Sequence, residues 1–512
     1  MMKKRSIICF MLALLIALGG VLAGCGGKKE VSQDEKVELK WVFGGPGKLE
    51  DSEYVWGEFN KKLESYLPNT TVKFTCIPHS NYAEKWRLMS ASQEEVDIAW
   101  ISWALKFADE VAKGSYMDIT DLINEYGQDM KADFPEWLLD LTTINGRVYA
   151  IPNYQMMTNP TGFSIKKSHV DKGWIDLKEA EKVLTEDDNL TKDDYKIFED
   201  YFKKVIDSGE KVKYVSDQFL TRAIYYKIGL PKGGLETITA NAAIAKSEDG
   251  YKVYNTLTDF PGWYEYYDVV NDWYNKGIIR KDILENPKET EGDYLLWWCS
   301  LLKGEELALK NKYPNDEMTI FACDPLKYIP YNGSNTNTAI ASQSKHPERA
   351  MQLLNLMNSK KGAELLNMLS FGIEGEHYNK TGDNRIEFLG SSVVGSSNNK
   401  YGYENWALGN ALVTYETQNN IEGWGEYVHN EINMQAEISR LAGFNLEQNP
   451  IKLEIAQYNA IMKEYEYLDA GTTANYKDIL TERNAKLREA GSDKIVEEVQ
   501  RQVDEWVKAN NK

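Results

Sequence analysis

Residues 39–47 read LKWVFGGPG, a short apolar run that ends in a turn rich in glycine and proline. Apolar residues at helical spacing follow as far as Pro68, and residues 71–77 (TVKFTCI) then alternate as a second strand. A helix is predicted over 82–89 and a compact strand over 96–100 (VDIAW). Strands that alternate with helices in this way predict an α/β fold with a largely parallel sheet.

The pattern changes after this first α/β region. A strand over 148–151 closes it, and residues 193–310 are mostly helical, beginning at a capping box formed by Thr191 and Asp194. The run at 318–322 is expected to be a strand that returns to the first sheet. This order predicts two lobes, each assembled from non-contiguous pieces of the chain.

The carboxyl ends of the predicted strands are the expected place for a ligand. In open α/β sheets, ligands bind beyond these ends. The rule indicates residues 44–47, Trp100 to Trp103, and 153–155.

Charge and composition exclude several classes of protein. The 512 residues include 59 Lys and Arg against 78 Asp and Glu, a net charge of −19, so a nucleic-acid binder or a polybasic membrane protein is not expected. Five Cys and five His are too few for a disulfide-built scaffold or a zinc module. Common hydrolase, nucleotide-binding and metal-binding motifs are absent from the sequence, so no cofactor and no metal are expected.

The first 25 residues predict export. Lys3, Lys4 and Arg5 precede the apolar run 7–18, and Leu-Ala-Gly-Cys then ends at Cys25. The tetrapeptide resembles the bacterial lipobox, in which the cysteine becomes lipidated and the signal is cut before it. The expectation is a signal peptide over 1–24 and a lipidated Cys25 with a polar tether over 25–36; an uncleaved anchor is the alternative.

The aromatic composition favours binding of sugar rings. The chain has 31 Tyr and 14 Trp against 15 Phe, and Tyr and Trp suit surfaces that are apolar on one side and wet on the other. A pyranose presents an apolar face for stacking and a rim of hydroxyls for polar side chains. Core packing remains the alternative for any single aromatic. The residues with the best claim to the site follow predicted strands or stand in an adjacent pair: Trp100, Trp103, Tyr154, Gln155 and Trp298.

Three further cysteines carry no metal or redox motif. Cys76 shares a strand face with apolar residues and is expected to be a buried, inert thiol. A disulfide between Cys299 and Cys323 is left open.

Short motifs in a fixed order resemble the family-1 extracellular solute-binding proteins, the sugar-binding lipoproteins that feed ABC importers. In the first part of the chain these are WVFG at 41–44, YAEK at 82–85, GRVYAIP at 146–152 and HPERA at 346–350. The later part is similar to a long oligosaccharide-type branch, through FGIEGEHY at 371–378, WALGN at 406–410, GFN at 443–445, REAG at 488–491 and EVQRQV at 498–503.

The resemblance implies a two-lobed periplasmic-binding-protein fold of type II, with a hinge and a cleft that closes on ligand. It places residues 37–153 and about 311–370 in an N-terminal α/β lobe, and 154–310 and about 371–512 in a helix-rich C-terminal lobe. Carried over by motif, the ligand-binding residues are Trp100, Trp103, Tyr154, Trp298, Tyr378, Trp406 and Asn410. The turn containing Glu374, His377 and Tyr378 is equally consistent with a structural role.

The expected function is therefore binding, without catalysis, of a carbohydrate for an ABC importer. The expected partners are the sugar, the permease subunits and the membrane through the lipid anchor alone, with no nucleic acid, and the protein is expected to be a monomer on the outer face of the cell membrane. A secreted glycoside-active enzyme, a binder of peptides or other solutes on the same fold, and a surface adhesin are the alternatives. For the enzyme alternative, the carboxylates to consider are those nearest the predicted cleft, Asp97, Glu374 and Glu376.

Overall fold

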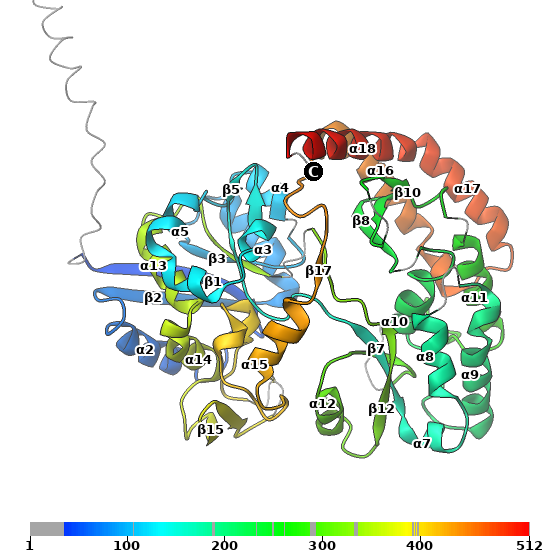
Figure 1. Cartoon of the computed structure of the whole chain (residues 1–512), viewed down its shortest axis with the longest axis horizontal. Coiled ribbons are helices and arrows are strands. Elements are labelled where there is room, and N and C mark those ends of the chain that lie inside the picture. Colours follow the sequence, from blue (N-terminus) through cyan, green and yellow to red (C-terminus); the bar gives the residue numbers. More distant parts are fainter. Residues whose placement is uncertain are drawn as a thin grey trace, which may run out of the picture.

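The computed structural model describes residues 35–510, except 106, 187–189, 232, 248–249, 261, 287–292, 332–335, 392–393, 395 and 397–398. The predicted signal peptide (1–24), the lipobox residue Cys25 and nearly all of the tether lie outside the described residues. The described chain forms two lobes joined by a few crossing segments (Figure 1). The predicted two-lobed α/β architecture is confirmed.

Lobe 1 is built on a five-stranded sheet with the order β2-β1-β3-β14-β6. The strands are β1 (Val37–Gly45), β2 (Thr70–Pro78), β3 (Ile98–Ile101), β6 (Ile151–Pro152) and β14 (Asn337–Ile340). β1 is parallel to β2 and β3, whereas β14 is antiparallel to β3 and β6. The alternating apolar runs near the start of the chain thus form neighbouring parallel strands, as predicted.

Helices and a late segment of the chain complete the core of lobe 1. The helices are α2 (Ser52–Leu63), α3 (His79–Ala91), α4 (Phe107–Ala112), α5 (Thr120–Tyr126), α6 (Gln128–Asp133), α13 (Pro347–Met357) and α14 (Ala363–Phe371). Val55, Phe59 and Leu63, which are four residues apart, form the buried face of α2. Tyr403 and Leu408 also lie in this core, so residues 401–413 pack on lobe 1. The sequence had placed them in the other lobe.

Lobe 2 contains an antiparallel sheet with the order β11-β7-β12. Its strands are β7 (Thr161–Lys166), β11 (Trp297–Ser300) and β12 (Met318–Asp324), and its helices include α7 (Lys167–Asp171), α8 (Leu177–Thr185), α9 (Lys196–Ser208), α10 (Asp217–Phe219), α11 (Trp263–Asn275) and α12 (Glu305–Lys312). The prediction that 318–322 returns to the first sheet is wrong. β12 pairs with β7, and the strand that returns is β14.

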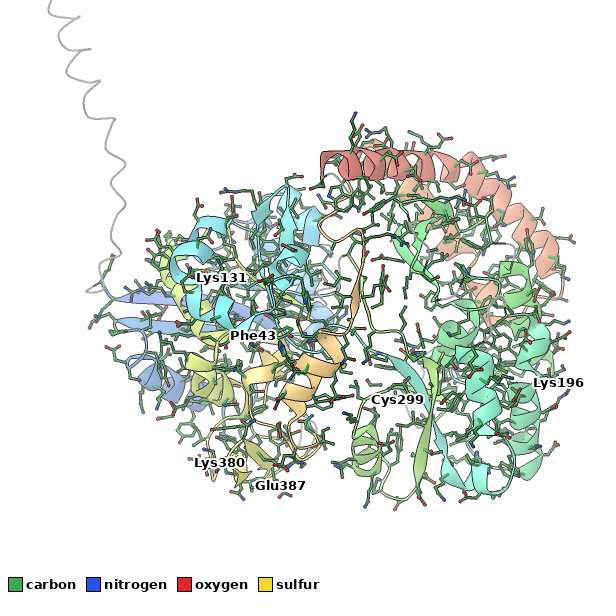
Figure 2. All side chains as sticks on the ribbon, in the orientation of Figure 1. Phe43, Lys131, Lys196, Cys299, Lys380 and Glu387 are labelled. Carbon is green, nitrogen blue, oxygen red and sulfur yellow. The ribbon has the colours of Figure 1, made fainter. Side chains whose placement is uncertain are left out.

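A local prediction within lobe 2 is confirmed. The Thr191–Asp194 capping box is present, with Thr191 N donating to Asp194 Oδ2 over 2.7 Å, and it starts the turn that leads into α9. The aromatic residues Tyr266, Tyr267 and Trp273 of α11 are buried in the core. Lys196, at the start of α9, lies on the outer edge of the lobe (Figure 2).

A further part of lobe 2 joins a small sheet to the C-terminal helices. The sheet has the order β10-β9-β8, from β8 (Leu235–Thr239), β9 (Ala242–Ala245) and β10 (Tyr254–Asn255). The helices are α16 (Lys452–Glu464), α17 (Tyr476–Glu489) and α18 (Ser492–Ala509), and Figure 1 shows them curving over the top of the lobe. The apolar stripe of α18 is buried through Ile495, Val499 and Val503. A separate hairpin, β15 (Tyr378–Gly382) and β16 (Arg385–Phe388), projects from lobe 1.

Three crossing segments, here defined as residues 153–160, 325–331 and 433–440, join the lobes. The second and third pair as short parallel strands, β13 (Tyr328–Ile329) and β17 (Glu437–Ile438), and Tyr328 N donates to Thr158 Oγ1 of the first over 2.9 Å. Glu236 of β8 ties them to lobe 2. Its buried carboxylate accepts hydrogen bonds from Tyr328 Oη at 2.7 Å, Tyr331 N at 2.6 Å and Ser439 Oγ at 2.6 Å.

The structure also bears on the predicted cysteine chemistry and on whether any helix could span a membrane. Cys299 on β11 and Cys323 on β12 flank β7 on opposite sides, and no disulfide joins them. Burial raises the pKa of Cys76 to about 12, in keeping with an inert thiol. Among the described residues, no helix has both the length and the apolar character that a membrane span requires.

Candidate functional site

A cavity of about 430 Å³, here called the interlobe cavity, is bounded by both lobes. Lobe 1 contributes Ser102, Trp103 and Phe107, which follow the carboxyl end of β3. Lobe 2 contributes residues around Ile238 of β8 and Phe444. The cavity therefore lies where the strand-end rule places a ligand, and the GFN motif at 443–445 forms part of its far wall.

Trp103 belongs to a group of rings at the inner end of lobe 1. This group, here called the tryptophan group, consists of Trp100, Trp103, Trp406 and His79. The Trp103 ring centroid lies 5.6 Å from that of Trp100 and 6.1 Å from that of Trp406. The two neighbouring tryptophans differ sharply in solvent exposure, since Trp100 is fully buried whereas Trp103 is 62% exposed. An exposed indole packed against a buried ring and two half-buried rings is suited to stacking on the apolar face of a sugar.

The local sequence explains why these rings meet. His79 follows β2 directly, Trp100 lies in β3, and both strands are parallel to β1, so their carboxyl ends are adjacent. Gly44, near the end of β1, makes the close approach possible. A Cβ atom at this position would stand 2.2 Å from Cζ3 of Trp100, so only glycine fits beside the ring.

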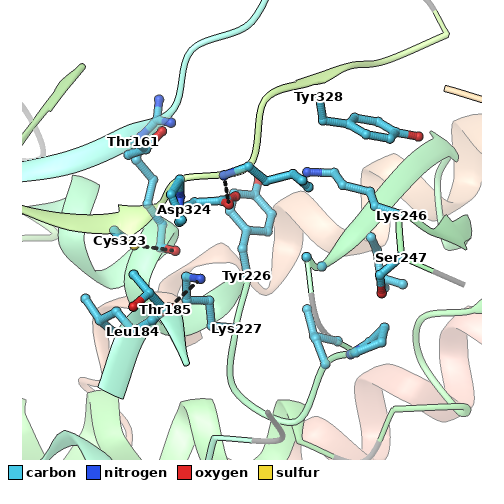
Figure 3. Close-up of a pocket in the computed structure, with 18 of the residues that line it drawn as sticks. Thr161, Leu184, Thr185, Tyr226, Lys227, Lys246, Ser247, Cys323, Asp324 and Tyr328 are labelled. Atoms are coloured by element: carbon cyan, nitrogen blue, oxygen red, sulfur yellow. Dashed lines mark hydrogen bonds between the residues drawn. The ribbon is translucent and has the colours of Figure 1, made fainter. Parts of the chain in front are cut away.

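A second cavity, of about 640 Å³, lies within lobe 2 beside the crossing segments. Figure 3 shows Cys323 and Asp324 at the end of β12 on one side, and Lys246 and Tyr328 on the other. Lys227 Nζ donates to the carbonyl oxygen of Leu184 over 2.9 Å. This lobe 2 cavity is lined by both cationic and anionic side chains and lacks a stacked group of tryptophans.

Trp298 is placed beside the lobe 2 cavity, away from the tryptophan group. The guanidinium of Arg222, which lines that cavity, lies 4.7 Å from the centroid of the Trp298 ring. Burial lowers the pKa of Arg222, which nevertheless remains a cation at neutral pH. The guanidinium of Arg222 therefore covers part of the Trp298 ring that a sugar would otherwise contact.

Tyr154 and Gln155 lie in the first crossing segment, where protein groups occupy their polar atoms. Tyr154 is buried, which raises its pKa, and its Oη lies 2.7 Å from Nδ1 of His429. Gln155 Nε2 donates to Thr336 Oγ1 over 3.0 Å. The backbone carbonyl oxygen of Gln155 accepts a hydrogen bond from Asn433 Nδ2. Both residues hold the crossing segment to its neighbours.

Tyr378 and Asn410 are not brought to the tryptophan group by a ring or hydrogen-bond contact. Tyr378 packs in a small core with Phe371, Ile386 and Phe388, under the hairpin whose outer face carries Lys380 and Glu387 (Figure 2). Asn410 is buried and its side chain caps the turn η6 (Ala411–Val413) by accepting from Leu412 N. Of the predicted residues, Trp100, Trp103 and Trp406 are the ones that assemble.

The three acids considered near the cleft are engaged elsewhere or exposed. Asp97 is buried, and its carboxylate accepts hydrogen bonds from Lys40 N and Ser344 Oγ. Glu376 accepts from Tyr54 Oη, and Glu374 lies 3.7 Å from Lys380 Nζ. Within the described residues, no three His, Cys, Asp or Glu side chains gather into a possible metal site.

The residues that sequence reasoning missed are His79, which belongs to the tryptophan group, and Glu404, which lies beside it. The imidazole of His79 is stacked on Trp406 at a centroid distance of 5.7 Å and an interplanar angle of 14°. Glu404 stands just before the turn η5 (Asn405–Ala407) that carries Trp406, and its Oε1 lies 3.5 Å from His79 Nε2. A signal was available, since His79 follows the same kind of strand end as Trp100.

A set of contacts on the opposite side of the molecule also bridges the lobes. The segment α15 (Trp424–Tyr427) and η7 (Val428–Asn433) packs on η6 of lobe 1 and reaches Lys303 of lobe 2. Lys303 Nζ forms an ion pair with Glu431 and lies 4.8 Å from the ring of Tyr427, whose hydroxyl accepts from Lys303 N. We call these contacts of Lys303 with Tyr427 and Glu431 the interlobe clasp.

Replacing Lys303 with alanine is expected to favour a more open arrangement of the lobes. Both charges are about half exposed, so the ion pair contributes less than about 1 kcal/mol, and the cation–π contact adds a similar amount. Small-angle scattering of the ligand-free variant should give a larger radius of gyration than wild type. Lys310→Ala, in the adjacent helix α12, is the control and should leave the radius unchanged; equal effects would contradict the role of the clasp.

Comparisons with known proteins agree with this geometry. Residues 440–508 match a family described as a domain of unknown function (DUF3502). A carbohydrate ABC transporter substrate-binding protein of Streptococcus pneumoniae is 24% identical over 530 residues, covering 99% of each chain.

Solved structures extend the likeness to three dimensions. The N-glycan transport solute-binding protein NgtS of Streptococcus pneumoniae has a TM-score of 0.75 and 22% identity, covering 93% of this chain and all of that one. An extracellular solute-binding protein of Bifidobacterium longum subsp. infantis has a TM-score of 0.57 and 13% identity, covering 92% and 98%. The resemblance drawn from short motifs therefore extends over nearly the whole chain, which has the fold of the substrate-binding proteins of ABC transporters.

Proposed function

We propose that the protein binds an oligosaccharide between its lobes and delivers it to the permease of an ABC importer, without changing it chemically. The observation that carries the proposal is the interlobe cavity, with exposed Trp103 on one wall and the GFN segment on the other. The full-length similarity to a carbohydrate substrate-binding protein supports the same function. Closure of the lobes around the sugar would be the signal that the permease recognises.

We further propose that Cys25 carries the lipid that holds the protein on the outer face of the membrane, and that the protein acts as a monomer. More than one acyl chain is needed for stable anchoring, which is what lipidation at a lipobox cysteine supplies. The polar tether after Cys25 would allow the lobes to reach the permease. Cys25→Ala is the variant that should release the protein from the membrane fraction.

Titration calorimetry with a panel of oligosaccharides tests the proposed function. Man5GlcNAc is included because the pneumococcal relative NgtS has been crystallised in complex with it. We expect a saturable one-site heat for at least one neutral oligosaccharide, and chromatography should recover that sugar intact. Shortened products would support the glycoside-active enzyme instead, and binding of peptides without sugars would support the other alternative.

Trp103→Ala is expected to weaken the binding of that oligosaccharide by about tenfold, because a lost stacking contact is worth about 1 kcal/mol beyond the lost apolar area. Calorimetry measures the change. Tyr226→Ala is the matched control, since Tyr226 is also strongly exposed, at 54%, but lines the lobe 2 cavity. A larger effect from Tyr226→Ala than from Trp103→Ala would move the proposed site to the lobe 2 cavity.

A further inference from the structure

His79 and Glu404 are two neighbouring residues among the described residues whose shielded side-chain polar atoms have no hydrogen-bond partner. Neither nitrogen of the His79 imidazole has a hydrogen-bond partner, and both are shielded from solvent. The Oε2 atom of Glu404 is in the same condition. The nearest approach between the two side chains is 3.5 Å, from Nε2 to Oε1. Three polar atoms with strong hydrogen-bonding capacity thus stand side by side without partners.

Folded proteins rarely leave such groups unpaired, because a buried donor or acceptor loses its bonds to water and gains nothing in return. At a ligand site, a bound molecule can supply the missing partner. The position of this pair favours that explanation, since it lies at the carboxyl ends of β1, β2 and β3.

The surroundings of the pair fit one kind of ligand. The His79 ring is contacted by Trp100 at 5.4 Å, Trp103 at 5.5 Å and Trp406 at 5.7 Å between centroids. Glu404 approaches β1 closely, since a Cβ atom on Gly45 would stand 3.6 Å from its Oε2. Of the three indoles, Trp103 is the one that is mostly exposed, so its displacement is the direct route by which a ligand would reach the pair.

We propose that His79 and Glu404 are a recognition pair for the hydroxyl groups of an uncharged pyranose, reached when Trp103 turns aside. A hydroxyl group can donate to the carboxylate and accept from the imidazole N–H, and a neighbouring hydroxyl can donate to the second imidazole nitrogen. The apolar face of the same ring then stacks on the indole of Trp103 in its turned position, so Trp103→Ala still removes a stacking contact. This inference rests on the proposed function and extends the proposed site from Trp103, which lines the interlobe cavity, to the pair beside it, with a stated sugar class.

The class of sugar follows from charge. A uronic or sialic acid would bring a carboxylate against Glu404, in a chain whose net charge is −19. Like charges at close range disfavour each other, and the effect is largest where water is excluded. The pair therefore selects neutral rings over acidic ones.

Calorimetry on the purified protein tests the pair with two variants. Glu404→Gln and His79→Phe should each weaken the binding of a neutral probe, Man5GlcNAc or whichever neutral oligosaccharide binds wild type, by tenfold or more. His79→Phe keeps an aromatic ring in place but removes both nitrogens. Glu422→Gln, an exposed acid outside the site, is the control and should bind as wild type does.

A purely structural role would give a different result. Because the three polar atoms have no protein partner, both variants should keep or raise the melting temperature while losing affinity. A fall in melting temperature together with the loss of affinity overturns the inference. A ¹⁵N NMR spectrum provides a second readout, since the chain has five histidines and the ring signals of His79 should shift when the sugar is added.

An acidic probe completes the experiment. An oligomannuronate should bind wild type at least tenfold more weakly than the neutral probe, and Glu404→Gln should narrow that difference. Variants that bind the neutral probe as tightly as wild type overturn this inference and leave the proposed function standing. If wild type binds no sugar at all, the proposed function fails first.

Discussion

Replacing Glu236 with alanine is expected to lower the free energy of unfolding by about 3–5 kcal/mol, because three hydrogen-bond donors lose their common acceptor. The Glu236 side chain is buried in β8 and accepts hydrogen bonds from Tyr328 Oη, Tyr331 N and Ser439 Oγ. Alanine leaves all three donors without an acceptor, and each unsatisfied buried group costs about 1–3 kcal/mol. Urea denaturation measures the loss.

The same substitution should disturb ligand binding, because the donors lie on the crossing segments. Tyr331 lines the interlobe cavity and Tyr328 lines the lobe 2 cavity. Thr237→Ala is the control: Thr237 is the next residue of β8 and is exposed, so its replacement should change stability by less than about 0.5 kcal/mol. A similar loss for both variants would mean that the strand, and not the carboxylate, is responsible.

Replacing Trp100 with alanine is expected to cost about 3–5 kcal/mol of stability, the usual range for a large aromatic side chain removed from a core. Trp100 is fully buried, and its ring contacts His79, Trp103, Trp406 and Tyr82, the last at 4.9 Å between centroids. The cavity left behind would also remove the support of the other indoles. Calorimetry should therefore detect weaker sugar binding in addition to the lower stability measured in urea.

Trp103→Ala serves as the matched comparison, because it removes the same side chain three residues later. Trp103 is 62% exposed, so we expect less than about 1 kcal/mol of lost stability but a clear loss of affinity. The two variants thus separate the supporting role of one indole from the binding role of the other. Equal losses of stability would contradict this division.

Local sequence patterns were sufficient for most elements but not for every strand or pairing; the strand predicted over 148–151 is divided into Arg147–Val148 and Ile151–Pro152, which pair with different strands. The runs at 39–43 and 71–77 became β1 and β2, and the capping box at Thr191 formed where it was predicted. The strand at 318–322 exists, but its partner was wrong, since pairing depends on contacts about 150 residues away that leave no local pattern. The same limit applies to residues 401–413, which pack on lobe 1 through contacts with distant segments, such as that of Tyr403 with Phe43 of β1.

The candidate site was predictable in part for a similar reason. Trp100 and Trp103 were found because they follow a recognisable strand, and Trp406 because it lies in a motif of a resembling family. Their assembly with His79 and Glu404 depends on how three strand ends and a distant turn meet. The roles of Tyr154, Gln155, Trp298, Tyr378 and Asn410 in binding remain predictions, and their packing shows what else each residue does.

The discontinuous composition of lobe 1 has a consequence for biosynthesis. Its core draws on residues from Val37 to Met157 and again from Ile329 to Leu408, with Leu412 and Val413 packed against it. Domains generally fold as units, in order of emergence. Here the first domain to leave the ribosome or the secretion channel lacks β14, α13 and α14 until most of the chain has been released. The N-terminal part of lobe 1 therefore remains incomplete until the strands β7, β11 and β12 of lobe 2 have been released. We expect a chaperone outside the membrane to protect its unfinished core during that interval.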